Sequence, residues 1–307
     1  MPGPSLIHLS LVAEDILLAE QAPAFVCDPL VPAEGVTFIH GPKSVGKSPF
    51  IWTLARAVAS GGRFLGMPTR QGRVLVVEID SPKSAVQRRY KLIPDVPQGW
   101  FTLWGAAFNI FRTEHPLCAA MLEAAQKIDP NLVILNTLRK AHPYDDKESQ
   151  VPSQFYRRFE ELFPGAARIV VHHDRKPSAE ANTPDHAQSG SEAWRNDAQS
   201  VIHLEKAGKG RMKVSHTASQ VSECLEPFTV YFVEGNSLIG LHNERDEMIV
   251  RVFQATEGSS GRQKAEAAAK TLAEMGIELS PVRVRNIVAE MTQGEDGSEG
   301  EKIGDPL

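Results

Sequence analysis

The chain has 307 residues, a formal net charge of −5, 42% hydrophobic residues and 23% charged residues. This apolar content is enough for a sizeable core, and the length fits one large α/β domain or a core of roughly 230 residues with a small appendage. The acidic balance excludes a protein coated in basic surface, so nucleic acid would have to meet a local basic cluster or the channel of an oligomer.

The cysteines and the apolar runs indicate a compartment. Cys27, Cys118 and Cys224 lie far apart and form no CxxC pair, which favours reduced thiols over a zinc site or a disulfide framework. No apolar run reaches the roughly 18 residues of a membrane-spanning helix. Residues 1–5 also lack the basic start of a secretory signal. We therefore expect a cytoplasmic protein that makes no contact with a membrane.

Residues 1–34 carry scattered apolar positions and then Pro23, Pro29 and Pro32. This pattern predicts a short helix or strand that leads into an extended N-terminal arm. The arm would either pack on a neighbouring subunit or cover its own core, and the sequence favours neither.

A phosphate-binding loop follows an apolar run at residues 36–39. Residues 41–48 read Gly-Pro-Lys-Ser-Val-Gly-Lys-Ser, which satisfies the pattern G-x-x-x-x-G-K-[ST]. Gly41 and Gly46 let the backbone curl until its N–H groups wrap a polyphosphate. Lys47 would reach the β- and γ-phosphates, and Ser48 would ligate Mg²⁺.

A helix should follow this loop, with the positive end of its dipole facing the bound anion. A proline is tolerated in the first turn of a helix, so Pro49 does not argue against it. The predicted contacts to ATP are Gly41, Pro42, Lys43, Ser44, Val45, Gly46, Lys47, Ser48 and Pro49.

Two acidic residues follow the next apolar run, at residues 74–77. The unbroken run predicts a strand buried on both faces of a parallel sheet. Glu78 and Asp80 would then lie at its carboxyl end, where open α/β sheets bind ligands. Their spacing of two puts them on one face, so either one would orient or deprotonate an attacking water. A solvated strand end without a catalytic role is the alternative.

Residues 132–136 have the form of a Walker B strand, in which four apolar residues precede a polar one. The terminal carboxylate of such a strand holds the water shell of Mg²⁺. Asn136 stands at that position here. Its amide accepts a hydrogen bond from a metal-bound water but has no charge, so we expect weaker Mg²⁺ binding unless Glu78 or Asp80 compensates.

A further strand is predicted from Arg168, with an apolar run at residues 169–171 that is followed by His172 and His173 and then by Arg175 and Lys176. We expect one of the histidines to touch the γ-phosphate and to sense its loss. The basic pair would meet phosphate oxygens. The alternative is that the histidines are ordinary core residues.

The next segments, residues 201–204, 212–216 and 228–233, have the apolar patterns of strands that complete a sheet edge. Basic residues lie on the turns between them, and one of these, or Arg195, would reach a neighbour's nucleotide site. These basic residues are Lys206, Lys209, Arg211 and Lys213.

The last quarter of the chain is predicted to be helical. A linker helix is expected near residues 244–256, followed by helices at 262–275 and from Pro281, with Ser280 as N-cap. Two helices around a short turn are compatible with a helix-turn-helix that reads DNA, and equally with a plain helical hairpin. We expect a C-terminal helical segment over 244–292 and a disordered acidic tail over 293–307.

Taken in order, these motifs resemble those of the RecA-like ATPase superfamily, and most closely the RepA-like hexameric helicases of plasmid and phage replication. The resemblance covers residues 25–235. The segments that carry it are residues 41–48, 74–82, 87–89, 136–142, 172–177 and 190–191.

The resemblance implies an α/β fold, a RecA-like core with a mostly parallel central sheet over residues 35–243. It also implies a hexameric ring with ATP and Mg²⁺ at the subunit interfaces. Single-stranded nucleic acid, which we expect to be DNA, would run through the pore along the loops after Asn136 and Lys176. Arg139, Lys140, Arg175 and Lys176 are the corresponding candidate contacts.

The family's scheme also assigns catalytic roles. Lys47 would bind phosphate, Ser48 would bind Mg²⁺, Glu78 would be the catalytic base and His173 the phosphate sensor. A basic residue within 206–213 would be the finger that acts on a neighbouring subunit. The sequence departs from the scheme twice, because Asn136 replaces the Walker B aspartate and because residues 213–217 offer only lysine and histidine for the finger arginine.

Three functions follow from these observations. The first is an ATPase that acts on nucleic acid as a helicase or as a replication or recombination motor. The second is a scaffold or regulator that binds ATP in order to assemble and hydrolyses it weakly or not at all, and Asn136 favours it. The third is a small-molecule kinase, which leaves the strands that end in Glu78 and His173 without a role.

Overall fold

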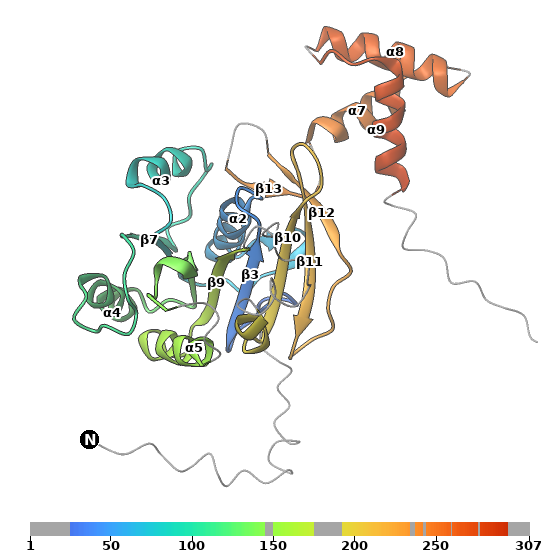
Figure 1. Ribbon diagram of the computed structural model, residues 1–307. Helices are drawn as coiled ribbons and strands as arrows, with labels where there is room; N and C mark the ends of the chain where they lie inside the picture. Colours follow the sequence, from blue (N-terminus) through green and yellow to red (C-terminus); the bar gives the residue numbers. More distant parts are fainter. Residues whose placement is uncertain are drawn as a thin grey trace, which may run out of the picture. The chain divides into compact units, whose positions relative to one another are not determined.

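The computed structural model describes residues 25–144, 150–174, 192–233, 237–241, 244–258, 260–275 and 277–293. Its core is a β-sheet covered by helices (Figure 1). Within the described residues the sheet has nine strands in the order β13-β12-β11-β10-β3-β9-β8-β6-β7. The expected α/β fold with a mostly parallel sheet is confirmed.

Four of the central strands are the apolar runs that the sequence shows. They are β3 (Val36–Gly41), β6 (Val74–Glu78), β8 (Leu132–Asn136) and β9 (Ala167–His173). Nearly every residue in them is buried, because helices lie on both faces of a parallel sheet. With β7 (Trp100–Trp104) and β10 (Ser200–Lys206) they form an unbroken parallel set of neighbours.

The sheet continues beyond β10 with strands of the other direction. Strand β11 (Arg211–Ser219) pairs antiparallel with β10. Strand β12 (Phe228–Phe232) pairs antiparallel with β13 (Ile239–Gly240). The expected edge strands are therefore present, and β10 joins them directly to β3.

The helices of the core alternate with the strands in the chain. They are α2 (Lys47–Ser60), α3 (Lys83–Tyr90), α4 (Pro116–Ile128) and α5 (Val151–Leu162), with the 3₁₀-helix η2 (Leu138–Lys140) after β8. One apolar cluster joins alternate residues of the strands, such as Phe38 and Leu135, to Met121 of α4 and Phe155 of α5. Helix α2 contacts β3, β6 and β7.

Residues 25–34, expected as part of an arm, lie on the chain's own core. Strands β1 (Phe25–Cys27) and β2 (Val31–Pro32) form a hairpin, and Leu30 between them is fully buried. The hydroxyl of Ser200 donates a 2.8 Å hydrogen bond to the carbonyl oxygen of Leu30. Short pairs also form between β4 (Arg63–Phe64) and β5 (Met67–Pro68). Residues 1–24, the rest of the expected arm, lie outside the described residues.

The chain divides into two compact units, the first made of residues 1–229 and 236–238 and the second of residues 230–235 and 239–307. The second unit contains α7 (Glu244–Ala255), α8 (Gly261–Glu274) and α9 (Pro281–Gln293), which pack around Ile249, Leu272 and Ile287. The Ser280 hydroxyl caps α9 by accepting a 3.3 Å hydrogen bond from the N–H of Arg283. The expected acidic tail from residue 294 onward lies outside the described residues.

None of the described helices is both long enough and apolar enough to cross a membrane.

Candidate nucleotide site

The loop between β3 and α2 has the backbone that a phosphate cradle requires. Gly46 has φ 118°, in the left-handed region that favours glycine. A Cβ placed on Gly41 would collide with the carbonyl oxygen of Leu204 in β10. Both glycines of the motif are therefore needed, one for its dihedral angle and the other because β10 passes so close. A cradle of this kind, at the start of a helix, fits a polyphosphate.

Lys47 is folded back over this loop. Its side chain is buried, and Nζ donates hydrogen bonds to the carbonyl oxygens of Gly41 at 2.6 Å and Pro42 at 2.8 Å. Burial lowers the pKa of Lys47 to about 8, although the carboxylates of Asp174 and Asp80 oppose this change. The amine is thus held over the loop where the motif predicts contact with phosphate.

Glu78 is buried at the end of β6, with 1% of its surface exposed. Trp52 Nε1 donates a 2.9 Å hydrogen bond to Oε1, and Asn136 Nδ2 donates one of 2.9 Å to Oε2. Burial raises the pKa of Glu78 to about 7, while the bonds from Trp52 and Asn136 act in the opposite direction. A carboxylate with a pKa near neutrality is suited to take a proton from water at physiological pH.

Asn136, at the Walker B position, lies next to the phosphate loop. It lies opposite Glu78 in the parallel register of β6 and β8. Its Nδ2 atom is 3.4 Å from Ser48 Oγ. The sequence predicts that this amide accepts a bond from a metal-bound water, whereas its nitrogen faces both Glu78 and Ser48. Asn136 therefore positions the carboxylate and the hydroxyl, and two of the three predicted Mg²⁺ residues, Ser48 and Asn136, lie together.

Asp80, the third, contacts His173 and Lys140. Its carboxylate lies 3.6 Å from His173 Nε2 and 3.5 Å from Lys140 Nζ, and Lys140 also donates a 2.7 Å bond to the Asp80 carbonyl oxygen. Contact with His173, and then Lys140, holds the pKa of Asp80 below its usual value. His173, the expected phosphate sensor, therefore touches the residue expected to hold Mg²⁺.

The predicted nucleic-acid contacts are only partly described. Arg139 is exposed in η2, and the charge of its neighbour Lys140 is paired with Asp80. Arg175 and Lys176 lie outside the described residues, as does the expected loop over 177–189. Among the finger candidates, Lys213 lies 4.0 Å from Glu205, which shares its strand pair.

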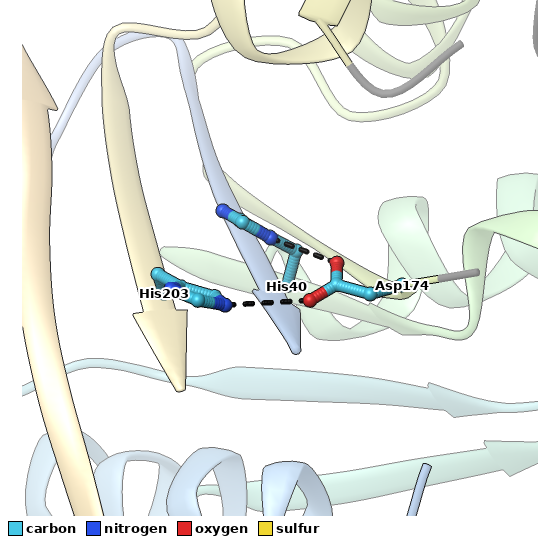
Figure 2. Close-up of side chains that lie close together, drawn as sticks. All are labelled: His40, Asp174 and His203. Carbon is cyan, nitrogen blue, oxygen red and sulfur yellow. Dashed lines mark hydrogen bonds and ion pairs between the residues drawn. The ribbon is translucent and has the colours of Figure 1, made fainter. Parts of the chain in front are cut away.

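A cluster of side chains that the sequence does not predict lies beside the phosphate loop. Figure 2 shows His40 of β3 and His203 of β10 directed at the carboxylate of Asp174, which follows β9. Burial alone would raise the pKa of Asp174, but hydrogen bonds from His203 and His40 hold it well below its usual range. The N–H of Asp174 donates to the carbonyl oxygen of Gly41, which links the cluster to the phosphate loop.

Trp52 and this cluster are the groups near the site that sequence reasoning misses. The periodicity of α2 marks Trp52 only as an apolar core residue, and its N–H donor gives no separate signal. His203 reaches the site because β10 lies parallel to β3 with His203 opposite His40, a pairing between distant segments of sequence that no local pattern indicates.

Comparison with known proteins agrees with this architecture. A family model described as an AAA domain matches residues 4–179, more than half of the chain. A solved structure described as an ATPase domain superposes with a TM-score of 0.53 at 12% sequence identity, covering 78% of this chain and 99% of that one. No curated protein sequence matches the chain. These matches confirm the expected RecA-like P-loop ATPase fold.

Proposed function

The chain belongs to the AAA domain family, and from this premise we propose that it binds ATP with Mg²⁺ in the loop 41–48, hydrolyses the nucleotide, and uses the cycle to act on nucleic acid. The observation that carries the proposal is the buried triad of Trp52, Glu78 and Asn136 beside Ser48, because it places a carboxylate of near-neutral pKa next to the phosphate loop.

Each residue of the site has a defined task in this proposal. Lys47 exchanges the carbonyl oxygens of Gly41 and Pro42 for phosphate oxygens, and Ser48 offers its hydroxyl oxygen to Mg²⁺. The bound ion would neutralise charge on the β- and γ-phosphates. Glu78 accepts the proton of the attacking water, while Trp52 and Asn136 fix the orientation of its carboxylate.

The missing Walker B carboxylate is partly offset in this arrangement. Asn136 cannot supply charge, but it holds Glu78 at 2.9 Å and lies 3.4 Å from Ser48 Oγ. Glu78, once ionised, brings the negative charge that Asn136 lacks to the position beside Ser48. We therefore expect hydrolysis to survive. Its rate should depend more on the position of Glu78 than on the affinity for Mg²⁺.

Action on nucleic acid and assembly into a ring rest on the order of motifs and on Arg139, which is exposed after β8. A hexamer would place ATP between subunits and would bring basic residues of several copies to one channel. A chain with a net charge of −5 can bind nucleic acid in such a channel, because Arg and Lys residues of several subunits are concentrated there.

The second candidate function is a nucleotide-gated scaffold. Its specific support is that the amide of Asn136 occupies the position of a carboxylate. In this case ATP would bind and favour assembly, and release of phosphate would be slow or absent.

Steady-state ATP hydrolysis with and without single-stranded DNA, at two salt concentrations, separates the candidates. The motor predicts stimulation by DNA that weakens as salt rises and is lost in Lys47→Ala. Lys127→Ala, a change of an exposed lysine in α4, is the control. Tight ATP binding without turnover under any of these conditions contradicts the motor and supports the scaffold.

A further inference from the structure

The cluster of His40, Asp174 and His203 has the composition and location of a built site. His40 lies near the end of β3, Asp174 directly follows β9 and His203 lies within β10, which are three neighbouring strands. The sheet register fixes His203 opposite His40. Only 5% of the surface of His40 is exposed, and the two imidazole rings stack with centroids 4.5 Å apart and planes inclined by 15°. His40 is therefore held by packing before any ligand arrives, while the side chains of His203 and Asp174 are 26% and 28% exposed.

The donor atoms of these residues converge. His40 Nδ1 lies 2.9 Å from Asp174 Oδ1, and His203 Nε2 lies 3.3 Å from Asp174 Oδ2. One ligand atom from each residue can be chosen so that all three lie within 4.8 Å of one another. Ligands at about 2.0–2.2 Å from a tetrahedral ion stand roughly 3.3 Å apart, so small side-chain rotations suffice to surround an ion.

The chemistry of the donors selects the ion. Hard ions such as Mg²⁺ and Ca²⁺ prefer oxygen, whereas imidazole nitrogen suits Zn²⁺ and its transition-metal neighbours. Two imidazoles and one carboxylate form a set of three protein ligands that leaves a fourth position open. We propose that His40, Asp174 and His203 form a binding site for a divalent transition-metal ion, with Zn²⁺ as the ion that fits best.

A carboxylate also lies near the outer nitrogen of His203. His203 Nδ1, the nitrogen that faces away from Asp174, lies 3.9 Å from Glu205 Oε2 on the same strand. Carboxylates at the far nitrogen of metal-bound histidines fix the ring orientation and raise ligand basicity. Lys213 Nζ lies 4.0 Å from the same oxygen.

The location gives the ion a consequence for the phosphate loop. His40 precedes Gly41 directly, and the carbonyl oxygen of Gly41 accepts bonds from both Asp174 N–H and Lys47 Nζ. An ion bound to Asp174 would brace β3, β9 and β10 where the loop begins. The site shares no residue with the Mg²⁺ contacts proposed at Ser48 and Asn136, and its test needs no nucleotide.

The test is metal binding by the untagged full-length protein after treatment with EDTA and removal of the chelator. Co²⁺ is added as a spectroscopic probe and Zn²⁺ is titrated by calorimetry, each without ATP. We expect one Co²⁺ per chain with visible absorption typical of nitrogen and oxygen ligands in a four-coordinate site, and displacement of Co²⁺ by Zn²⁺. Thermal unfolding should shift upward with Zn²⁺ because the ion binds the folded state.

Two variants locate the ion. His203→Gln should lower Zn²⁺ affinity by more than the about 10- to 100-fold that loss of an outer-shell partner costs. His115→Gln alters a half-buried histidine outside the cluster and should bind as the wild type does. Circular dichroism verifies that both variants fold.

Absence of a stoichiometric Co²⁺ or Zn²⁺ site in the wild type overturns the proposal, whatever the variants do. Equal affinity in the wild type and His203→Gln also overturns it, because the ion would then bind elsewhere. With either result, His40, Asp174 and His203 would be a hydrogen-bonded cluster without a metal ion. Neither result bears on ATP hydrolysis.

Discussion

Asn136 Nδ2 donates a 2.9 Å hydrogen bond to Oε2 of Glu78 across the adjacent ends of β8 and β6. The residue at the Walker B position thus acts on the carboxylate proposed as the base. Residue 136 can therefore orient Glu78 without carrying a negative charge itself. The predictions for substitutions at Asn136, Trp52 and Glu78 depend on this contact.

Asn136→Asp should destabilise the protein in the absence of Mg²⁺. A carboxylate oxygen would replace the amide donor next to Glu78, and two buried acids so close cannot both ionise. One of the two must therefore keep a proton that the unfolded chain releases at neutral pH, so at about 1.4 kcal/mol per pKa unit we expect a loss of about 1–3 kcal/mol, with recovery when Mg²⁺ and ATP are added. Thermal unfolding with and without Mg²⁺·ATP measures both effects.

Asn131→Asp is the matched control, because the Oδ1 atom of Asn131 accepts a bond from Arg73 N–H and an aspartate keeps that acceptor. Equal unfolding temperatures for Asn136→Asp and the wild type in EDTA would show that Asn136 does not contact Glu78 as described.

Trp52→Phe should shift the pH dependence of hydrolysis. The indole N–H stabilises ionised Glu78 and lowers its pKa, so its loss raises the pKa and moves the acidic limb of the rate profile to higher pH. Trp104→Phe removes a different indole bond, to Ser81, and should leave the profile in place. Identical profiles for both variants and the wild type would contradict a positioning role for Trp52.

The stability of the nucleotide-free protein should depend on pH through Glu78. Burial raises its pKa from 4.5 to about 7, so between these values the folded state holds a proton that the unfolded chain has released. Stability therefore falls as pH rises through this window, by up to about 3 kcal/mol.

Urea unfolding at pH 5 and pH 8 in EDTA, for the wild type and Glu78→Gln, isolates this contribution. Glutamine does not titrate, so the stability of the wild type relative to the variant should decrease from pH 5 to pH 8. A difference that stays constant across this range would show that Glu78 is not the titrating group.

The cysteines should differ sharply in reactivity. Cys27 and Cys118 are fully buried, and burial, followed by the charge of Asp28, raises the pKa of Cys27 to about 12. Cys224 is exposed. Because the thiolate is the reactive form, we expect Ellman's reagent to modify one thiol rapidly at pH 8 in the native protein and three in denaturant. Rapid modification of Cys27 in the native state would contradict its burial.

Local patterns predict much of this fold. The apolar runs before Gly41, Glu78 and Asn136 have the form of strands buried on both faces, and each is a strand of the parallel sheet. Ser280 followed by Pro281 predicts the start of α9. In these places the propensity of the segment and its burial agree, so short windows of sequence suffice.

Other features of the site depend on contacts between distant segments. The sequence shows that Glu78 and Asn136 each end a strand, but their pairing and the orientation of the Asn136 amide follow from the register of β6 and β8. Asp80 and Glu78 are both acidic residues that follow the apolar run at 74–77, yet Asp80 contacts His173 and Lys140 instead of Asn136. Burial, hydrogen bonding and pKa arise from this assembled arrangement and have no counterpart in a local pattern.

The most direct test of the account is a single-turnover measurement of phosphate release from Mg²⁺·ATP by the wild type and by Glu78→Gln, with nucleotide binding measured in parallel. Glu123→Gln, on the exposed face of α4, is the control. We predict that the wild type releases phosphate and that Glu78→Gln binds ATP but releases phosphate about 10²- to 10⁴-fold more slowly, the usual contribution of a general base. Equal rates in the two proteins, or no release by the wild type, would contradict the claim that Glu78 supports hydrolysis without a Walker B carboxylate.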